Sequence, residues 1–454
     1  MISTSELLDI GQYILSKAEN YSFSEIETYI VQGGRTSTDI RDATITGSQS
    51  QTISSIGVRV FNGQSLGAAY TTTHTKEAID QIMNRAAKIA KNAPKDKYFR
   101  KLLDLEEPKY STVNGLYDPT IDHFDKQKIL DYANDLIEIA HNKDDRAIIN
   151  GSFSVLGIGV AILNSHGISK TDRFSAVSMN ASASISLDDH NVGTGNDFWL
   201  ARNLDHLKDH VENVAVTAVK KAQQALNPQK ISGGKDFTFL IDGRNSYSWI
   251  GSLLSNGISA KAVFEGESYF SDKIGEKILP EGISIIDDPL FTGGFESCSF
   301  DDEGAPTKTT ELIDESGRLK TFVTDSYTAN AMNLPITGHA SRGNPASRPS
   351  PSLHQLYIKE GESGTFLEML GEIKKGVILE SSLSDMGIVG TNISEKLNRA
   401  FYIENGEIQY GIKNGMMATT VEDFLMGIDK VGSELLTEFG RRAPPITVSG
   451  ISIS

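Results

Sequence analysis

The densest group of ionisable side chains in the sequence is the run Phe300-Asp301-Asp302-Glu303-Gly304. Three adjacent carboxylates resist full ionisation when they are buried, so they need hydrogen-bond donors, a cation or water around them. Glycines and a proline flank the run, and that composition is also typical of a solvated turn. The pattern therefore leaves two interpretations open, an acidic surface turn and a functional cluster of carboxylates.

A polar loop at residues 337–349 holds further groups that could do chemistry. It contains Gly338, His339, Arg342 and Arg348 among serine, glycine and proline residues, a pattern too broken for a core element. Planar guanidinium groups suit paired oxygens, so either arginine could bind a peptide carboxylate or backbone. The alternative is a surface connection, which the spacing alone favours.

Two histidines four residues apart, His206 and His210, would share one face of a helix and could hold a metal ion with Asp205 or Asp209. The apolar stripe of the same segment begins at Leu207, which leaves both imidazoles on a solvated flank. We therefore interpret them as surface residues.

Common catalytic signatures are missing from the sequence. It has no Gly-x-Ser-x-Gly elbow, no phosphate-binding Gly-x-x-x-x-Gly-Lys-Ser/Thr loop, no Gly-x-Gly-x-x-Gly turn and no His-Glu-x-x-His. These absences disfavour a serine hydrolase of the common fold, a P-loop NTPase and a dinucleotide-dependent enzyme.

The totals set the broad class. Among 454 residues, 43 Lys and Arg stand against 59 Asp and Glu, a net charge of −16 that repels phosphate backbones, so we expect no direct nucleic-acid binding. The single cysteine, Cys298, cannot form an internal disulfide, and the first residues do not resemble a secretory signal. No apolar run approaches about 20 residues, so we expect a cytoplasmic protein that does not enter membranes.

Periodicity predicts an α+β fold with two domains. In residues 1–228 it indicates an opening helix capped by Ser3 and Glu6, a hairpin at Asn62-Gly63, helices at 76–92, 125–140 and 204–226, and strands at 25–32 and 147–186. We expect an N-terminal α+β domain with strand meanders and packing helices. The turn-forming segment 227–235 marks the boundary.

Residues 229–454 are predicted to form a mainly antiparallel β domain with short helices. The expected strands include 237–241, 282–286, the pair 309–313 and 318–324, and a hairpin around Asn405-Gly406. The expected helices are 245–256, 325–332 and 421–436.

Several segments follow one another in an order that is similar to one known family. They are Ile40-Arg41-Asp42 through Gly57-Val58-Arg59-Val60-Phe61-Asn62-Gly63, Ser271-Asp272-Lys273-Ile274-Gly275-Glu276, Ile285-Ile286-Asp287-Asp288-Pro289, Ser299 to Thr307, and Thr337-Gly338. In this order they resemble landmarks of the TldD/PmbA family (peptidase U62-like), and the resemblance covers nearly the whole chain.

The resemblance implies a subunit that pairs with a second one around a cavity. The TldD kind carries His-Glu-x-x-x-His on a helix early in its second domain, plus a late cysteine, and is a zinc metalloprotease acting on unfolded peptides. The PmbA kind, also called TldE, lacks those ligands. The matching window 245–256 of this sequence has no His or Glu, and 411–421 has no cysteine, which implies the PmbA/TldE kind.

From the resemblance we expect a subunit that supports proteolysis of unfolded peptides and holds no cofactor or catalytic residue of its own. Zinc is expected in a TldD-like partner, in a heterodimer; the alternative partner is a second copy of this chain. As a metalloprotease homologue, the chain is expected to be inactive alone and active only in a complex. Relatives are also called modulators of DNA gyrase, an effect that the charge makes indirect.

The resemblance also selects candidate residues for a peptide groove or subunit interface: Asp301, Asp302, Glu303, Gly304, Gly338, His339 and Arg342. Two alternative functions stay open. One is a free-standing homodimeric peptide-binding or regulatory protein. The other is a metallopeptidase that recruits its ion through His339, His354 and the run 301–303.

Overall fold

The computed structural model describes residues 3–21, 23–188, 191–380, 387–397, 399–437 and 440–454. The chain is an α+β protein whose first sheet is six-stranded and antiparallel, in the order β3-β2-β1-β4-β5-β6. Its strands are β1 (Glu25–Arg41), β2 (Thr44–Asn62), β3 (Ser65–Thr71), β4 (Ile148–Asn164), β5 (Ser169–Asp188) and β6 (Asn191–Ala201).

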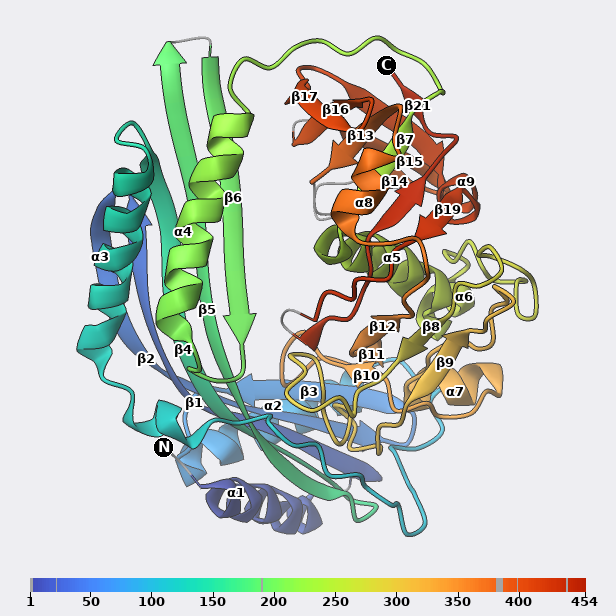
Figure 1. Ribbon diagram of the computed structural model, residues 1–454. Helices are drawn as coiled ribbons and strands as arrows, with labels where there is room; N and C mark the ends of the chain where they lie inside the picture. The colour runs from blue at the N-terminus through green and yellow to red at the C-terminus, as the bar shows by residue number, and fades with distance from the viewer. Residues whose placement is uncertain (1–2, 22, 189–190, 381–386, 398, 438–439) are drawn as a thin grey trace.

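Helices cover this sheet on the side away from the rest of the chain (Figure 1). They are α1 (Thr4–Lys17), α2 (Lys76–Asn92), α3 (Lys126–Lys143) and α4 (Leu207–Gln224), with 3₁₀ turns at Ala18–Asn20 and Pro119–His123. One apolar cluster lies between α3, α4 and the sheet, and a second joins α1 and α2 to β1, β2 and β4. The ranges of α1 and α2 confirm the predicted helices, because apolar residues recur there every three or four positions.

Helix α4 packs unusually close to the edge strand β6 because glycines face it. A Cβ built on Gly195 would lie 2.3 Å from the backbone nitrogen of Ala222, and one on Gly193 would lie 2.0 Å from its carbonyl oxygen. The opposite face of β6 carries Val192, Thr194 and neighbouring residues at alternate, exposed positions. The sheet thus presents an open face on the side away from α4.

The remaining chain forms several smaller sheets. A second six-stranded sheet has the order β17-β16-β13-β7-β20-β19, and only its β7–β13 pair is parallel among the described strands. These strands are β7 (Thr238–Ile241), β13 (Lys375–Leu379), β16 (Ala400–Glu404), β17 (Glu407–Gly411), β19 (Ile428–Val431) and β20 (Ile446–Val448). The prediction of mainly antiparallel β structure here is confirmed.

Among the described residues, the chain also forms three further sheets and five helices. The strands are β8 (Ile285–Asp287), β9 (Thr310–Ile313) and β12 (Leu356–Ile358); β14 (Gly387–Val389), β15 (Asn392–Lys396), β18 (Met416–Thr420) and β21 (Ser452–Ile453); and β10 (Ala340–Ser341) with β11 (Ser350–Pro351). The helices are α5 (Gly243–Ile258), α6 (Ala260–Glu265), α7 (Ser326–Met332), α8 (Phe366–Gly371) and α9 (Val421–Met426). No helix in the described ranges is long and apolar enough to cross a membrane.

Three local predictions are wrong in detail. The helix expected at 421–436 ends at Met426, and the chain continues as strand β19 because that segment pairs with β20. Residues 318–324 make isolated bridges instead of a strand. In the first hairpin Asn62 pairs with Ser65, so the two-residue loop starts at Gly63, where φ is 60°. The hairpin at Asn405-Gly406 has positive φ at both positions, as predicted.

Candidate functional site

One side of helix α5 packs into the hydrophobic core, and the other side lines a cavity. Asp242 caps the helix by accepting a hydrogen bond from the Asn245 backbone N–H at 2.7 Å. Trp249 is fully buried and stacks on Phe424 with ring centroids 5.0 Å apart. The core side of α5 fixes the helix, and its remaining side faces a cavity of ≈ 370 Å³.

Part of the window 245–256, in which the family resemblance places the metal-binding motif of a TldD-type chain, lines that cavity. It is lined by Tyr247, Ser248, Gly251, Ser252, Ser255, Asn256, Glu296, Ser352, Leu353, His354, Leu356 and Arg441. The residues of this window that line the cavity are tyrosine, serine, glycine and asparagine, with no histidine, glutamate or cysteine among them. Catalytic zinc sites use histidine, cysteine or carboxylate ligands, usually three of them, so this helix face does not fit zinc.

A polar cluster closes one side of the same cavity. The Tyr247 hydroxyl donates to Glu296 Oε2 at 2.8 Å, and the Arg441 guanidinium lies 5.0 Å from the Tyr247 ring centroid. Burial, reinforced by the Glu296 carboxylate, raises the pKa of Tyr247 well above its ordinary value. Tyr247 therefore stays a neutral hydrogen-bond donor, which suits binding of a polar chain better than proton transfer.

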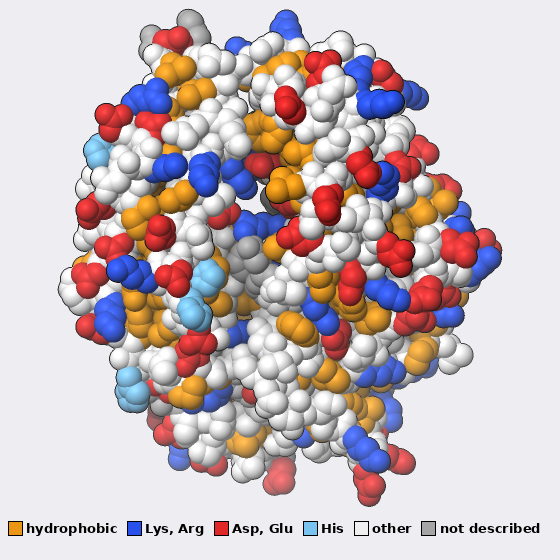
Figure 2. Space-filling view, in the orientation of Figure 1, with side chains coloured by type: hydrophobic (Ala, Val, Ile, Leu, Met, Phe, Trp, Pro, Cys, Tyr) orange, Lys and Arg blue, Asp and Glu red, His pale blue; other side chains and the backbone are white. Residues whose placement is uncertain are grey.

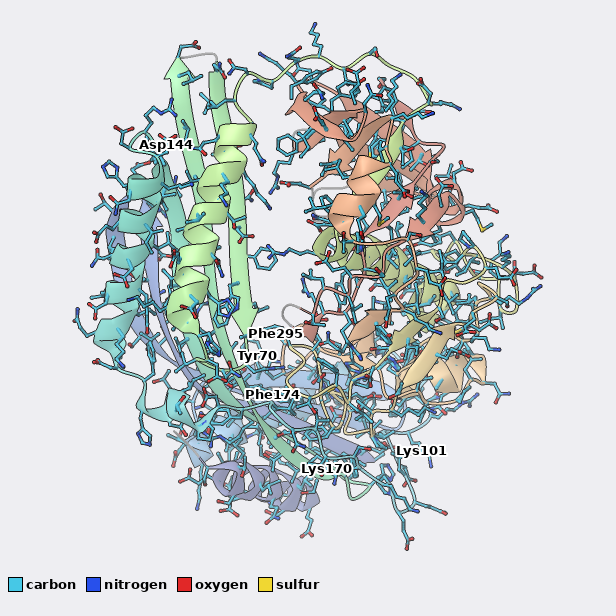
Figure 3. The ribbon with its side chains drawn as sticks, in the orientation of Figure 1. Tyr70, Lys101, Asp144, Lys170, Phe174 and Phe295 are labelled. Carbon is cyan, nitrogen blue, oxygen red and sulfur yellow. The ribbon has the colours of Figure 1, made fainter. Side chains whose placement is uncertain are left out.

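His354 connects the cavity to Cys298. Its Nε2 lies 2.8 Å from the Gly338 carbonyl oxygen, and its Nδ1 lies 3.7 Å from the Cys298 sulfur. Because a carbonyl only accepts, Nε2 must carry hydrogen, and Nδ1 faces the thiol. The Arg202 guanidinium lies 5.2 Å from the ring centroid of Phe174 and 4.8 Å from that of Phe295, two residues labelled in Figure 3, and burial lowers the pKa of Arg202 to about 10.

His339 is enclosed completely. It is 0% exposed, its Nε2 lies 3.0 Å from Asp287 Oδ2, and its Nδ1 lies 2.9 Å from the Thr337 hydroxyl. Asp287 also accepts the backbone N–H groups of His354 and Gln355, at 2.8 and 2.7 Å. Burial lowers the pKa of His339, since it outweighs the opposing effect of Asp287. The imidazole therefore acts as a neutral packing group that orients this loop.

Asp301 organises its own loop. One carboxylate oxygen accepts the backbone N–H groups of Glu303 and Ala305, each at 2.9 Å, and the other accepts the N–H of Ala340 at 2.9 Å. Positive φ angles at Gly304 (84°) and Gly338 (75°) shape the two turns that meet here. The side chain of Asp301 is 2% exposed, so its oxygens are committed within the chain.

A buried ionic network joins this loop to the first sheet. Glu27 on β1 receives two hydrogen bonds from Arg59 on β2, at 2.9 and 3.0 Å, and a contact from Arg342. Arg59 also lies 3.9 Å from Glu303, whose carboxylate accepts bonds from Ser326 at 2.7 Å. Burial raises the pKa of Glu303 to about 8, with neighbouring carboxylates adding to the rise.

Asp302 completes the same junction. It accepts hydrogen bonds from the Tyr29 hydroxyl and from the Arg342 backbone N–H, both at 2.7 Å. The structure thus brings the run 301–303 and Arg342 together, but their polar groups are bonded to other residues of the same chain. The side chain of Arg342 is 1% exposed. Their role in a peptide groove or subunit interface stays a prediction. Sequence reasoning missed Glu27, Arg59 and Asp287, which hold these candidates in place.

The other predicted residues lie apart from this junction. His206 is exposed at the start of α4, with a φ of 52°, and His210 stacks on Trp199 at 4.4 Å. Within the described residues, no group of three or more His, Cys, Asp or Glu side chains is placed to hold a metal ion. His339, His354 and the run 301–303 are therefore used for hydrogen bonding and packing in this structure.

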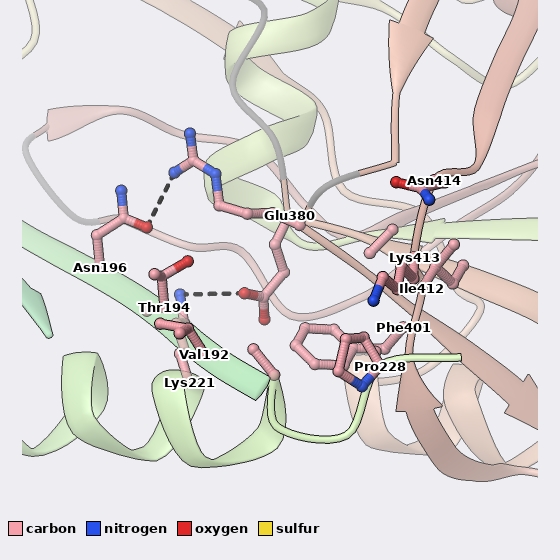
Figure 4. A pocket seen from close by; sticks show the side chains of 15 residues that line it. Val192, Thr194, Asn196, Lys221, Pro228, Glu380, Phe401, Ile412, Lys413 and Asn414 are labelled. Atoms are coloured by element: carbon pink, nitrogen blue, oxygen red, sulfur yellow. Dashed lines mark hydrogen bonds and ion pairs between the residues drawn. The ribbon is translucent and has the colours of Figure 1, made fainter. Parts of the chain in front are cut away.

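A cleft separates the open face of β6 from the second sheet. Figure 2 shows the hollow, with Lys and Arg side chains at its edge. Adjoining cavities of ≈ 150, 270 and 560 Å³ share lining residues, among them Lys221, which lines all three. Lys221 and Glu380 form an ion pair of 3.7 Å, and Arg399 donates to Asn196 at 2.9 Å, as Figure 4 shows. The walls of the cleft combine charged and amide side chains with apolar ones such as Phe198 and Phe401.

Comparison with known proteins identifies the family. Models of the PmbA/TldA metallopeptidase match in three pieces: domain 1 at residues 26–90, the central domain at 119–226 and the C-terminal domain at 234–454. The chain belongs to the PmbA/TldD metallopeptidase family, which confirms the resemblance seen in the sequence.

Individual relatives agree with this assignment. A metalloprotease of Methanocaldococcus jannaschii is 26% identical over 394 residues, 85% of this chain and 84% of that protein. A metalloprotease PmbA homolog of Haemophilus influenzae is 26% identical over 387 residues, 84% and 81% of the two chains.

Solved structures share the fold. TldE of Thermococcus kodakarensis superposes with a TM-score of 0.85 at 22% identity, covering 99% of both chains. A Thermotoga maritima protein named for modulation of a DNA gyrase gives a TM-score of 0.85 at 21% identity, covering 99% of this chain and 100% of that one.

Proposed function

We propose that this chain is a noncatalytic, PmbA/TldE-type subunit that supports the breakdown of unfolded peptides by a zinc-bearing TldD-type partner in the cytoplasm. One observation carries the proposal. The cavity beside helix α5 is present, but the helix residues that line it, such as Gly251, Ser252 and Asn256, include no histidine, glutamate or cysteine. These side chains do not provide the ligands that would activate a water molecule on zinc.

The chain's own contribution would be to bind and enclose the peptide. The open face of β6 carries Thr194 and Asn196 beside the exposed Val192 and Phe198, and β6 lies at the edge of its sheet, where an extended peptide could add as a further strand. The adjoining cleft supplies charged and amide side chains such as Lys221, Arg399 and Asn196. We also propose that the chain holds no cofactor and that zinc is bound by its partner.

A reconstitution experiment tests this function. The purified chain, a TldD-type zinc subunit and their equimolar mixture are each given a fluorescently labelled unfolded polypeptide, and cleavage is followed with time. We expect no cleavage by this chain alone, and cleavage by the mixture that exceeds that of the zinc subunit alone. A sample of this chain unfolded beforehand serves as the control for a nonspecific protein effect.

Two results of this experiment would contradict the proposed function. Cleavage by this chain alone, abolished by a chelator and restored by zinc, would refute the noncatalytic assignment. If the chain forms only homodimers and never changes the activity of the zinc subunit, a free-standing peptide-binding protein becomes the better description.

A further inference from the structure

A further cavity, separate from those described above, lies between the segment 269–278 and helix α9. Its volume is ≈ 150 Å³, and it is lined by Tyr269, Phe270, Lys273, Lys277, Ile278, Thr391, Thr420, Val421, Glu422 and Leu425. Helix α9 lies at the outer edge of the β7–β21 part of the molecule (Figure 1). None of these residues belongs to the cavity of α5 or to the cleft.

The floor of this cavity is formed by buried apolar residues. Val421 and Leu425 are 1% and 0% exposed, and Phe270 and Ile278 are 5% and 6% exposed. An apolar cavity of about 150 Å³ in a protein interior is large enough to bind benzene. The space therefore fits one phenyl ring or one branched aliphatic side chain, and little more.

Two ammonium groups share the same small space. Lys273 and Lys277 both line the cavity, and no ion pair among the described residues includes either of them. Glu422 is the acidic residue of the lining, so the lining carries a net positive charge in a chain of net charge −16. Such a site attracts an anion that also has an apolar group.

Residues in and beside the lining of the cavity would suit a peptide, because they include both polar and exposed apolar side chains. Thr391 lines the cavity, and its hydroxyl makes no hydrogen bond among the described residues. Ile274, Val389 and Met426 are 47%, 76% and 42% exposed, and each is within two positions of a lining residue in the sequence. Exposed apolar residues of this kind favour contact with a further chain segment.

We propose that this cavity binds the C-terminal residue of a polypeptide that ends in a large apolar amino acid. The side chain enters the apolar floor, and the terminal carboxylate lies between the ammonium groups of Lys273 and Lys277. A C-terminal residue carries its side chain and its carboxylate on one carbon atom, which matches a site where the apolar and cationic groups share ≈ 150 Å³. This site is separate from the cavity of α5, so it does not depend on the proposed function.

The test uses the full chain and two small probes, N-acetyl-L-phenylalanine and its amide. Binding is followed by methyl NMR with labelled isoleucine, valine and leucine. We expect the acid to shift methyl signals of Ile278, Val421 and Leu425 in a saturable way. The amide should bind about fivefold more weakly, because it lacks the negative charge that the two ammonium groups attract.

A charge-matched pair of variants completes the experiment. The double variant Lys273→Gln, Lys277→Gln should weaken binding of the acid by about the same fivefold factor and leave the amide unchanged. Lys261→Gln, Lys308→Gln removes two exposed lysines outside the lining and should change neither. Equal binding of acid and amide, no shift of these methyl signals, or an equal loss in the control variant would each overturn the proposal. No protease is present, so this outcome is independent of the reconstitution.

Discussion

The buried carboxylate of Glu27 is predicted to be a main determinant of stability at the junction between the first sheet and the loop 301–342. It is 1% exposed, receives two bonds from Arg59 and contacts Arg342. Burial alone would raise the pKa of Glu27, but the two guanidinium groups outweigh it and hold that pKa below its ordinary value. The stabilisation from its charge is therefore fully present above the unfolded-state pKa, and it is lost as the pH falls through the lower folded-state pKa.

The substitution Glu27→Gln keeps the size of the side chain and removes its charge. Two guanidinium groups would then remain buried without their main carboxylate partner. Breaking a buried ion pair in this way costs about 3–5 kcal/mol, and we expect a loss of that size in the free energy of unfolding. Urea denaturation at pH 7, followed by tryptophan fluorescence and by circular dichroism, measures the loss.

A surface ion pair provides the control. Lys101 and Asp104 lie 2.7 Å apart, but their side chains are 53% and 38% exposed. Lys101→Gln should therefore change the free energy of unfolding by less than about 1 kcal/mol. A loss below 1 kcal/mol for Glu27→Gln, equal to that of the control, would refute the assignment of this network as a stabilising contact.

Other measurements test further parts of the structure. Burial raises the pKa of Glu303 from its ordinary 4.5 to about 8, so the folded state holds that proton more tightly than the unfolded state. The free energy of unfolding should therefore fall as the pH rises between these two values. Glu303→Gln should flatten that slope in denaturation series from pH 5 to 8.5, and an unchanged slope would contradict the assignment. Gly195→Ala should lower the free energy of unfolding, measured by urea denaturation, by about 1–3 kcal/mol, because the added Cβ meets Ala222. Gly47→Ala, whose added Cβ has nothing within 4 Å, should change it by no more than about 0.5 kcal/mol. Equal effects would argue against close packing of α4. Elemental analysis of the purified chain after incubation with zinc and desalting should find less than one zinc per chain, and a stoichiometric, chelator-sensitive ion would contradict the proposed absence of a zinc site.

Local patterns in the sequence predicted much of the fold. Helix α2 begins and ends where periodicity placed it, because its apolar face and its cap at Thr75 are both encoded locally. The same reasoning failed after Met426. Ile428 and Val431 are three residues apart, a spacing that suits a helix, but pairing with residues 446–448 makes this segment a strand. That partner is distant in the sequence, so periodicity could not reveal it. The division of the chain at 228/229 stays a prediction.

The buried ionic network could not be predicted from the sequence for a similar reason: it depends on strand register and on contacts between distant residues. Counting back from the turn where Arg41 pairs with Thr44 would place Glu27 opposite Val58. An irregularity at Asp39 shifts the register by one residue, so that Glu27 lies opposite Arg59 instead. The candidate carboxylates 301–303 were recognised from composition, but their burial depends on this register and on contacts across more than 200 residues of chain.

The great length of the central strands couples parts of the molecule that would otherwise melt separately. Strand β1 supplies Ile30 to the apolar cluster under α1 and α2, and Ile40 to the cluster under α3 and α4. Strand β4 does the same with Leu163 and Phe153. Each strand is one continuous hydrogen-bonded ladder through both clusters, so amide protons at its two ends should exchange with solvent in a single cooperative opening.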